Sequence, residues 1–340
     1  MRNALERRFS SSQQVPEELF DLVLSPIRWQ LIDVSLELGV FDSLTDRQTD
    51  DEVAEMLSLQ HDQCRLFLNA LCSIDVLSKN KRGYKIRSEV APYLTSNSDR
   101  SLCNLLRYLS SVRHADKAEL KDMLRNGQSR HSAAGLRDHC HWDNSYKHLR
   151  EFHDTMSNPV AIDVITSLPG WPEARFFLDL GAGSDSLANA LISLKRDLRV
   201  SLFDLPGPAK AIERRLDASL PINVIAGDYN TANFENTYDI IWASMSLYFA
   251  QDIIELLKKL RAALTEKGVF VSFHEALRDD RTKPEAHVVG RLVPSLVNND
   301  LSLDDEFMAD RMRAAGFKKI VSKTIQTAYG EMRVDIGRKN

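Results

Sequence analysis

The sequence lacks the features that mark membrane, secreted and nucleic-acid-binding proteins. No apolar run approaches the length of a bilayer-spanning helix, so we expect no membrane segment. The amino terminus is polar and has no apolar core stretch, so we expect no signal peptide. The formal net charge is −4, from 44 Lys and Arg against 48 Asp and Glu, and it predicts no dedicated nucleic-acid surface.

Cysteine is also scarce, and the chain has four of them without a paired spacing: Cys64, Cys72, Cys103 and Cys140. This usage predicts reduced thiols in a cytoplasmic protein. His139 and His141 flank Cys140, but zinc sites need about four ligands, and no second cluster follows at a suitable spacing. We therefore expect no metal.

What the sequence does contain is a glycine turn between a strand and a helix, in the segment FFLDLGAGSDS at 176–186. An apolar strand runs into Asp179, Gly181 and Gly183, and a helix-compatible segment at 187–194 follows at once. This order lets the backbone approach a nucleotide-like ligand at the carboxyl edge of a parallel sheet. The segment therefore predicts a nucleotide-binding α/β domain.

Two acidic residues follow the next two predicted strands. Asp204 ends the strand at 199–203, where its carboxylate can accept hydrogen bonds from both ribose hydroxyls and would repel a 2′-phosphate. Asp228 follows the strand at 222–226, where it can reach an exocyclic adenine amine. The order predicts an adenosine-containing ligand other than NADP.

The glycine turn and the end of the chain distinguish between NAD and S-adenosylmethionine as the ligand. The NAD fingerprint requires a third glycine, which is missing after Gly183. The tail predicts a helix at 304–315 and then a hairpin of strands at 317–324 and 331–337. This closing hairpin is typical of class I S-adenosylmethionine-dependent methyltransferases, which this half of the chain resembles.

The amino-terminal hundred residues predict a winged helix. Thr49 opens a helix to Leu57 through a capping box, and Asp62 is expected to cap a second helix at 63–73. A hairpin with its turn near 80–83 follows.

The winged helix is expected to join subunits rather than to bind DNA. Residues 41–100 hold fewer basic than acidic side chains, whereas a phosphate-binding module needs the opposite balance. Before it, an apolar helical pattern runs over 16–24 and 27–38, and Pro26 is expected to kink or break it.

The order of a winged helix and a methyltransferase domain resembles the caffeate-type and acetylserotonin-type small-molecule O-methyltransferases. The segments that carry the resemblance are 36–41, 178–183, 203–206 and 227–228. It implies an α/β fold with a Rossmann-like seven-stranded sheet and a homodimer formed through the amino-terminal domain. The implied parts are a dimerisation domain at 1–100, a connector lining the pocket at 101–165 and a cofactor-binding domain at 166–340.

The same resemblance implies S-adenosylmethionine as the cofactor and S-adenosylhomocysteine as its product. The implied cofactor contacts are Asp179, Gly181, Gly183, Asp204, Leu205, Asp228, Tyr229 and Ser244. Asp185 departs from the family, which usually has a third glycine there. If Asp185 takes a positive φ, Asp is among the better-tolerated residues, and a carboxylate at a helix N-terminus is favoured by about 0.3–1 kcal/mol. We therefore expect the loop to survive.

A second departure concerns the catalytic base. The family usually carries Leu-His-Asp-Trp after the fourth strand, and its His deprotonates the acceptor hydroxyl. Tyr248 stands at that position here, and a phenol with a pKa near 10 is a poor base that can still orient a substrate. Other catalytic candidates are His274 at a strand end and His287 on the segment 285–297. Glu275 matches an acid that orients the family's His.

The acceptor is expected to be a small molecule, bound near Trp142, Phe152, Met156 and Asn298. Asp300 falls near a second acid of the family. O-methylation in specialised metabolism is the expected reaction, while sulfur, carbon and nitrogen acceptors stay open because the usual His is absent. The alternatives are a non-methylating enzyme on the same cofactor fold and a cofactor-sensing regulator that uses the winged helix on DNA.

Overall fold

The chain divides into two compact units, residues 1–110 and 111–340. The computed structural model describes residues 15–127, 139–234, 237–278, 280–297 and 300–340. The first unit has one hydrophobic core and the second has two. The division into three segments with boundaries at 100 and 165 stays a prediction.

The first unit begins with one long helix, α1 (Val15–Leu38), and Pro26 lies inside it. Pro26 therefore does not break the helix, and the kink that was the other expected outcome stays a prediction. A proline removes one backbone hydrogen bond, and the helix continues because the apolar pattern persists on both sides. The short helices of this unit are α2 (Val40–Ser43) and α5 (Ala91–Leu94), and α6 (Cys103–Arg113) begins in it.

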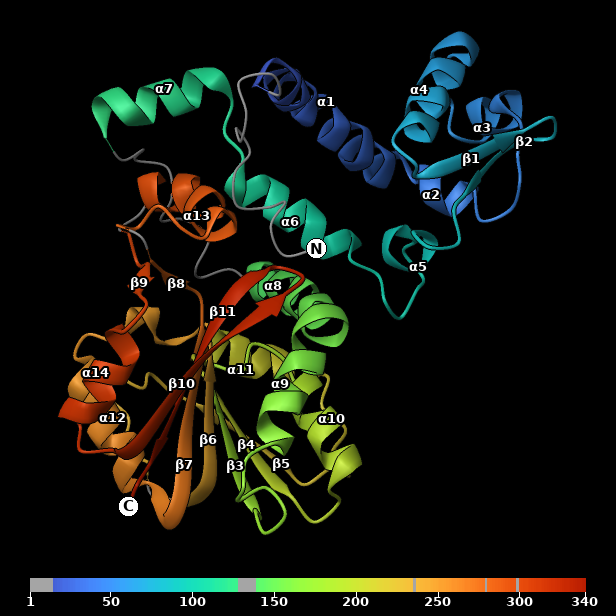
Figure 1. Cartoon of the computed structure of the whole chain (residues 1–340). Helices are drawn as coiled ribbons and strands as arrows, with labels where there is room; N and C mark the ends of the chain where they lie inside the picture. The colour runs from blue at the N-terminus through green and yellow to red at the C-terminus, as the bar shows by residue number, and fades with distance from the viewer. Residues whose placement is uncertain (1–14, 128–138, 235–236, 279, 298–299) are drawn as a thin grey trace. The chain divides into compact units, whose positions relative to one another are not determined.

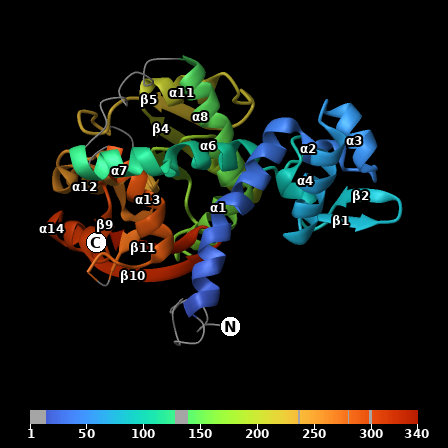
Figure 2. The ribbon, with the colours of Figure 1, turned by 90° about the horizontal axis from the view of Figure 1, so that it is seen from above.

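Two helices and a hairpin follow in the order expected for a winged helix, and Figure 2 shows the hairpin beside α4. They are α3 (Asp50–Met56), α4 (His61–Ser73), β1 (Leu77–Asn80) and β2 (Gly83–Ile86). The capping box of Thr49 is confirmed. The cap predicted at Asp62 was wrong, because α4 begins at His61, two residues before the predicted start, and Asp62 forms an ion pair with Arg65 inside its first turn.

The second unit is built on a seven-stranded sheet in the order β10-β11-β7-β6-β3-β4-β5 (Figure 1). Its strands are β3 (Phe176–Leu180), β4 (Arg199–Asp204), β5 (Ile222–Ala226), β6 (Tyr238–Ser244), β7 (Leu264–His274), β10 (Lys318–Thr327) and β11 (Gly330–Arg338). The strands from β5 to β7 are parallel, whereas β11 is antiparallel to both β7 and β10. The closing hairpin expected from the sequence is therefore confirmed.

Helices cover both faces of this sheet, and Figure 1 shows α9 and α10 on one side with α12 and α14 on the other. Neighbouring residues of β3 enter different cores, as Phe177 and Leu178 do. The helices of this unit are α7 (Lys117–Asn126), α8 (His139–Phe152), α9 (Asn158–Thr166), α10 (Ser186–Leu194), α11 (Pro206–Glu213), α12 (Ile253–Ala262), α13 (Glu285–Val297) and α14 (Phe307–Ala314).

Short elements adjust this plan near the carboxyl edge of the sheet. A π-helical turn, η1 (His153–Ser157), joins α8 to α9, and a 3-10 turn, η2 (Leu247–Phe249), follows β6. The strands β8 (Ala276–Leu277) and β9 (Leu303–Asp304) pair in parallel. This pairing explains why α14 starts later than the sequence predicted, since Leu303 and Asp304 are already used as a strand.

Candidate functional site

The turn after β3 is shaped by two glycines in the left-handed region. Gly181 has φ 80° and Gly183 has φ 64°, which side chains disfavour. A Cβ on Gly181 would stand 2.4 Å from the Cβ of Ser246, whose hydroxyl donates to the carbonyl of Leu180 at 2.6 Å. The turn is therefore packed directly against the segment that follows β6.

Asp204 holds the glycine turn from the neighbouring strand. The backbone N–H of Gly183 donates to Oδ2 of Asp204 at 2.8 Å, and that of Leu205 donates to Oδ1 at 2.7 Å. Burial raises the pKa of Asp204 against the opposing effect of these hydrogen bonds. Hydroxyl groups that donate to this carboxylate would stabilise its charged form.

Asp179 is a second buried carboxyl group at the same turn. Its exposed fraction is 4%, and burial together with the negative charge of Asp204 raises its pKa to about 8. Asp179 is therefore protonated in the ligand-free protein at neutral pH. A cationic ligand group placed nearby would favour its ionised form.

The loops after β5 and β6 complete this edge. The backbone and side-chain amides of Asn230 both donate to Oδ1 of Asp228 at 2.9 Å, and Tyr229 donates its hydroxyl to the carbonyl of Ser246 at 2.9 Å. Ser244 ends β6. The structure thus brings the eight residues expected to contact the cofactor to the carboxyl ends of β3, β4, β5 and β6, and their binding roles stay predictions.

Asp185 has an ordinary backbone conformation, with φ −87°, so a glycine is not needed there. Its carboxylate is 2% exposed and accepts hydrogen bonds from the Tyr146 hydroxyl at 2.6 Å, Arg150 at 2.9 Å and Asn189 at 2.8 Å. Asp185 therefore ties α8 to the start of α10, and this role explains an acidic residue beside the turn.

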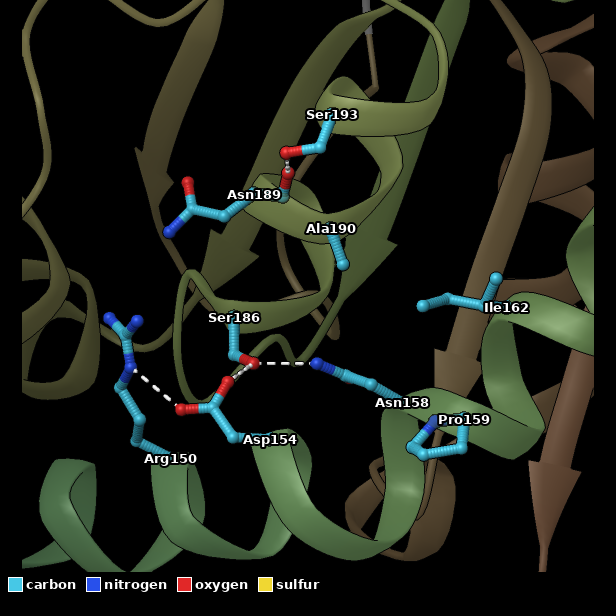
Figure 3. Close-up of a pocket in the computed structure, with 9 residues that line it drawn as sticks. All are labelled: Arg150, Asp154, Asn158, Pro159, Ile162, Ser186, Asn189, Ala190 and Ser193. Carbon is cyan, nitrogen blue, oxygen red and sulfur yellow. Dashed lines mark hydrogen bonds and ion pairs between the residues drawn. The ribbon is translucent and has the colours of Figure 1, made fainter. Parts of the chain in front are cut away.

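A pocket of about 350 Å³ shares Arg150 and Asn189 with this cluster, and Figure 3 shows the residues that line it. Asn158 donates to the Ser186 hydroxyl at 2.6 Å, and Ser186 donates to Asp154, which accepts from Arg150 at 3.1 Å. The pocket contains none of the residues expected to bind the cofactor. Helices rather than strand ends line it, so it is distinct from the glycine-turn site.

The π-helical turn η1 presents a histidine that no sequence motif marked. Nδ1 of His153 lies 2.7 Å from the hydroxyl of Ser184. Its Cε1 lies 3.7 Å from the position that a Cβ on Gly183 would take. Burial lowers the pKa of His153 to about 4, so its ring is neutral at pH 7. Insertions of this helical type are frequent at functional sites.

Tyr248, Glu275 and Arg291 form a hydrogen-bonded trio. Tyr248 donates its hydroxyl to Oε2 of Glu275, and Arg291 donates from Nε to Oε1 at 2.7 Å. The guanidinium of Arg291 lies 4.4 Å from the centre of the Tyr248 ring. Sequence reasoning singled out Tyr248 and Glu275 but missed Arg291, which no motif marks.

The charges of this trio limit its chemistry. Burial and the negative charge of Glu275 raise the pKa of Tyr248 well above its ordinary value. Burial alone would raise the pKa of Glu275, but the charge of Arg291 and the hydrogen bond from Tyr248 outweigh it and lower that pKa. The trio therefore holds a neutral phenol against a charged carboxylate, so Tyr248 can orient a ligand but is a poor proton acceptor.

His274 ends β7 and is 2% exposed. Its Nδ1 lies 3.0 Å from the hydroxyl of Ser272, while its buried Nε2 has no hydrogen-bond partner among the described residues. Burial lowers the pKa of His274 to about 4. His274 therefore keeps one ring nitrogen that could accept a proton, and its catalytic role stays a prediction.

His287 and Asp300 are engaged in structural contacts. Nε2 of His287 donates to the carbonyl of Glu331 at 2.5 Å, which fixes the ring against the closing hairpin. Asp300 accepts hydrogen bonds from Arg281 at 2.9 Å and from the backbone N–H of Ser302 at 3.0 Å. These contacts explain both residues without a ligand, and their catalytic roles stay predictions.

The predicted acceptor contacts are described only in part. Phe152 packs edge-on against Tyr329 at 4.9 Å between ring centres, and Met156 is half-buried in η1. The side chain of Trp142 and the whole of Asn298 lie outside the described residues. The His139, Cys140 and His141 side chains lie outside them as well.

Three further expectations concern absences. Within the described ranges, no group of three or more His, Cys, Asp or Glu side chains could hold a metal ion. Cys64, Cys72 and Cys103 form no disulfide bond among the described residues. Searched over the same part of the chain, no helix has the length and apolar character to cross a bilayer.

Comparison with known proteins adds to this geometry. Residues 178–272 match the family described as "Methyltransferase domain". The chain is 23% identical to the N,N-dimethyltransferase OxyT of Streptomyces rimosus over 316 residues, which cover 87% of this chain and 89% of that protein. It is 28% identical to the acetylserotonin O-methyltransferase of Bos taurus over 203 residues, which cover 56% and 59%.

The fold is also that of a solved structure. The crystal structure of human N-acetylserotonin methyltransferase in complex with SAM matches with a TM-score of 0.81 at 20% identity. The match covers 97% of this chain and 99% of that one. The expected α/β fold with its Rossmann-like sheet is confirmed.

Proposed function

We propose that this chain is a class I S-adenosylmethionine-dependent methyltransferase and that it methylates a small molecule with that donor. The observation that carries the proposal is the convergence of the glycine turn, Asp204 and Asp228 on one edge of a parallel sheet. Asp204 would hold the ribose hydroxyls and Asp228 the adenine amine. Ligands of open α/β sheets bind at this edge.

The site suits a cationic donor. S-adenosylmethionine supplies an electrophilic methyl group on a positively charged sulfur. Asp179 and Asp204 lie at the turn with raised pKa values, so a nearby positive charge would favour their ionised forms. The left-handed glycines let the backbone approach the ligand closely.

The acceptor side is organised by Tyr248, Glu275 and Arg291. Tyr248 would orient the acceptor, and the trio offers no group ready to take its proton. A hydroxyl acceptor in specialised metabolism remains the first candidate, with an acidic phenol favoured because it ionises easily. Nitrogen is the second candidate, since an amine can attack before it loses a proton and the relative OxyT is named an N,N-dimethyltransferase.

The active form is proposed to be a cytoplasmic homodimer joined through the amino-terminal unit. Helix α1 exposes several large apolar side chains: Leu19, Phe20, Val23 and Ile27 are each at least 50% exposed. A second copy of the chain would cover this face, because contiguous exposed apolar patches mark interaction sites.

The proposal is tested by following the methyl group. Purified protein is incubated with S-adenosylmethionine carrying a deuterated methyl group and a panel of phenols, amines and thiols. We expect one acceptor class to gain the labelled methyl while S-adenosylhomocysteine forms in equal amount. Asp204→Asn should lose this activity at limiting donor. Conversion of an acceptor without the label would indicate the non-methylating alternative, and salt-dependent binding to duplex DNA would support the regulator.

A further inference from the structure

His153 is a partly buried ring at the glycine turn that the proposed chemistry does not use. It comes from η1, and its Cε1 lies 3.7 Å from the Cβ position of Gly183. Because Nε2 is bonded to Cε1, the second ring nitrogen also lies beside the turn. The ring therefore packs beside the glycine turn, next to Leu149.

The hydrogen bond to Ser184 sets the state of the ring. The Ser184 hydroxyl accepts from the backbone N–H of Ser186 at 3.3 Å, so its own proton is available for Nδ1 of His153 at 2.7 Å. A neutral imidazole that accepts at Nδ1 carries its proton on Nε2. The Nε2–H group of His153 can therefore donate a hydrogen bond beside the turn.

Under the proposed function, the nucleoside half of S-adenosylmethionine already has binding partners. Asp204 and Asp228 would take the nucleoside half, and both follow strands on one side of β3. The amino-acid half would then lie beside the glycine turn, where η1 contacts α10, whose N-terminus at Ser186 favours negative charge. An N–H donor at this place suits a carboxylate.

The charges around His153 permit this. Arg150 forms ion pairs with Asp154 at 3.1 Å and with Asp185 at 2.9 Å, so both carboxylates near the ring have a positive partner. Asp185 is further neutralised by hydrogen bonds from Tyr146 and Asn189.

We propose that His153 binds the carboxylate of the donor's amino-acid half through Nε2–H, with Ser184 holding the ring in that tautomer. The contact rests on the proposed function, because it assumes that this turn binds S-adenosylmethionine. His153 is a cofactor-binding residue in this account, with no role in moving the acceptor's proton.

The test compares two ligands by calorimetry on the full chain. One is S-adenosylhomocysteine, and the other is its decarboxylated analogue, which keeps the amine. We expect the native protein to bind the first more tightly. His153→Phe should weaken S-adenosylhomocysteine at least about tenfold and change the analogue less than about twofold, because a hydrogen bond to a charged group is lost.

Two further variants keep the test decisive. His153→Gln, which restores an N–H donor, should recover part of the affinity for S-adenosylhomocysteine, and Ser184→Ala should give a smaller loss than His153→Phe. The matched control His61→Phe changes an exposed histidine of the other unit and should bind both ligands as the native protein does. If His153→Phe folds poorly, the Gln and Ser184 variants supply the comparison.

The calorimetry distinguishes failure of the His153 contact from failure of the cofactor site. Equal losses for both ligands, or no loss for either, would overturn the carboxylate contact while leaving the cofactor site in place. Failure of the native protein to bind S-adenosylhomocysteine would instead remove the proposed function on which the contact rests.

Discussion

At the scale of single residues, the site depends on charges that are compensated inside the protein. Glu275 is 13% exposed and Arg291 22% exposed, so their ion pair is mostly shielded from water. Removing one partner of such a pair leaves an uncompensated charge, whereas removing both does not. The trio around Tyr248 is therefore a structural unit as well as a candidate acceptor site.

We predict that Arg291→Met destabilises the protein by about 3 kcal/mol, because the charge of Glu275 is left without its partner. The double variant Glu275→Gln/Arg291→Met should recover most of this loss. Denaturant unfolding measures both changes. Arg313→Met, which removes an exposed arginine paired with Asp310, is the matched control and should shift stability by less than about 0.5 kcal/mol. Equal stability of the single and double variants would contradict the prediction.

The raised pKa of Asp179 predicts that the stability of the protein depends on pH. Its carboxyl ionises near 4 in the unfolded chain and at about 8 in the folded protein, so the folded state holds more protons between these values. Stability should therefore fall as pH rises from 5 to 8. Relative to Asp179→Asn, the native protein should lose roughly 1 kcal/mol per pH unit in the ligand-free state. Parallel pH profiles for the two proteins would show that Asp179 is already ionised.

At the scale of elements, the sequence predicted the order of helices and strands better than the residues at which they begin and end. Thr49 and the turn near Gly83 were found because each carries a local signal, a capping box or a hairpin turn. Pro26 misled because a proline removes only one backbone hydrogen bond and α1 continues past it, and Asp62 misled because its carboxylate pairs with Arg65 inside the helix. His153 and Arg291 could not be found, since their partners are brought together only by η1 and α13.

The turn after β3 gives a prediction at this scale. Gly181→Ala would force a Cβ to within 2.4 Å of Ser246 in a left-handed backbone, so we expect loss of S-adenosylhomocysteine binding and a lower melting temperature. Gly170→Ala is the matched control, because a Cβ there meets nothing within 4 Å and no positive φ is required. Thermal unfolding with and without ligand measures both variants. A Gly181→Ala protein that binds normally would show that the turn can relax.

At the scale of the whole molecule, the sequence predicted the fold class because the glycine turn, the spaced acids and the closing hairpin recur in a fixed order. That order is matched by the seven-stranded sheet and by the whole-chain likeness to human N-acetylserotonin methyltransferase. The acceptor could not be predicted, since Tyr248 replaces the expected histidine and the pocket depends on side chains from several elements. Assembly is the other open property at this scale.

We predict that Phe20→Glu/Val23→Glu converts the proposed dimer to a monomer. The Phe20 and Val23 side chains are 76% and 75% exposed on α1, and a second copy of the chain would bury them. In the variant, the dimer would instead bury four negatively charged glutamates close to one another. Light scattering after size-exclusion chromatography measures the mass. The control Glu17→Gln/Glu18→Gln changes the polar start of the same helix and should remain dimeric. A monomeric native protein would contradict the assembly.

Titration calorimetry of ligand-stripped protein with S-adenosylhomocysteine decides whether the glycine turn binds the adenosyl cofactor. The proposed cofactor site predicts saturable binding of one ligand per chain. It also predicts at least a tenfold loss of affinity in Asp204→Asn, whose charge would no longer hold the ribose hydroxyls or the glycine turn. Absence of binding to the folded native protein, or unchanged affinity in Asp204→Asn, would contradict it.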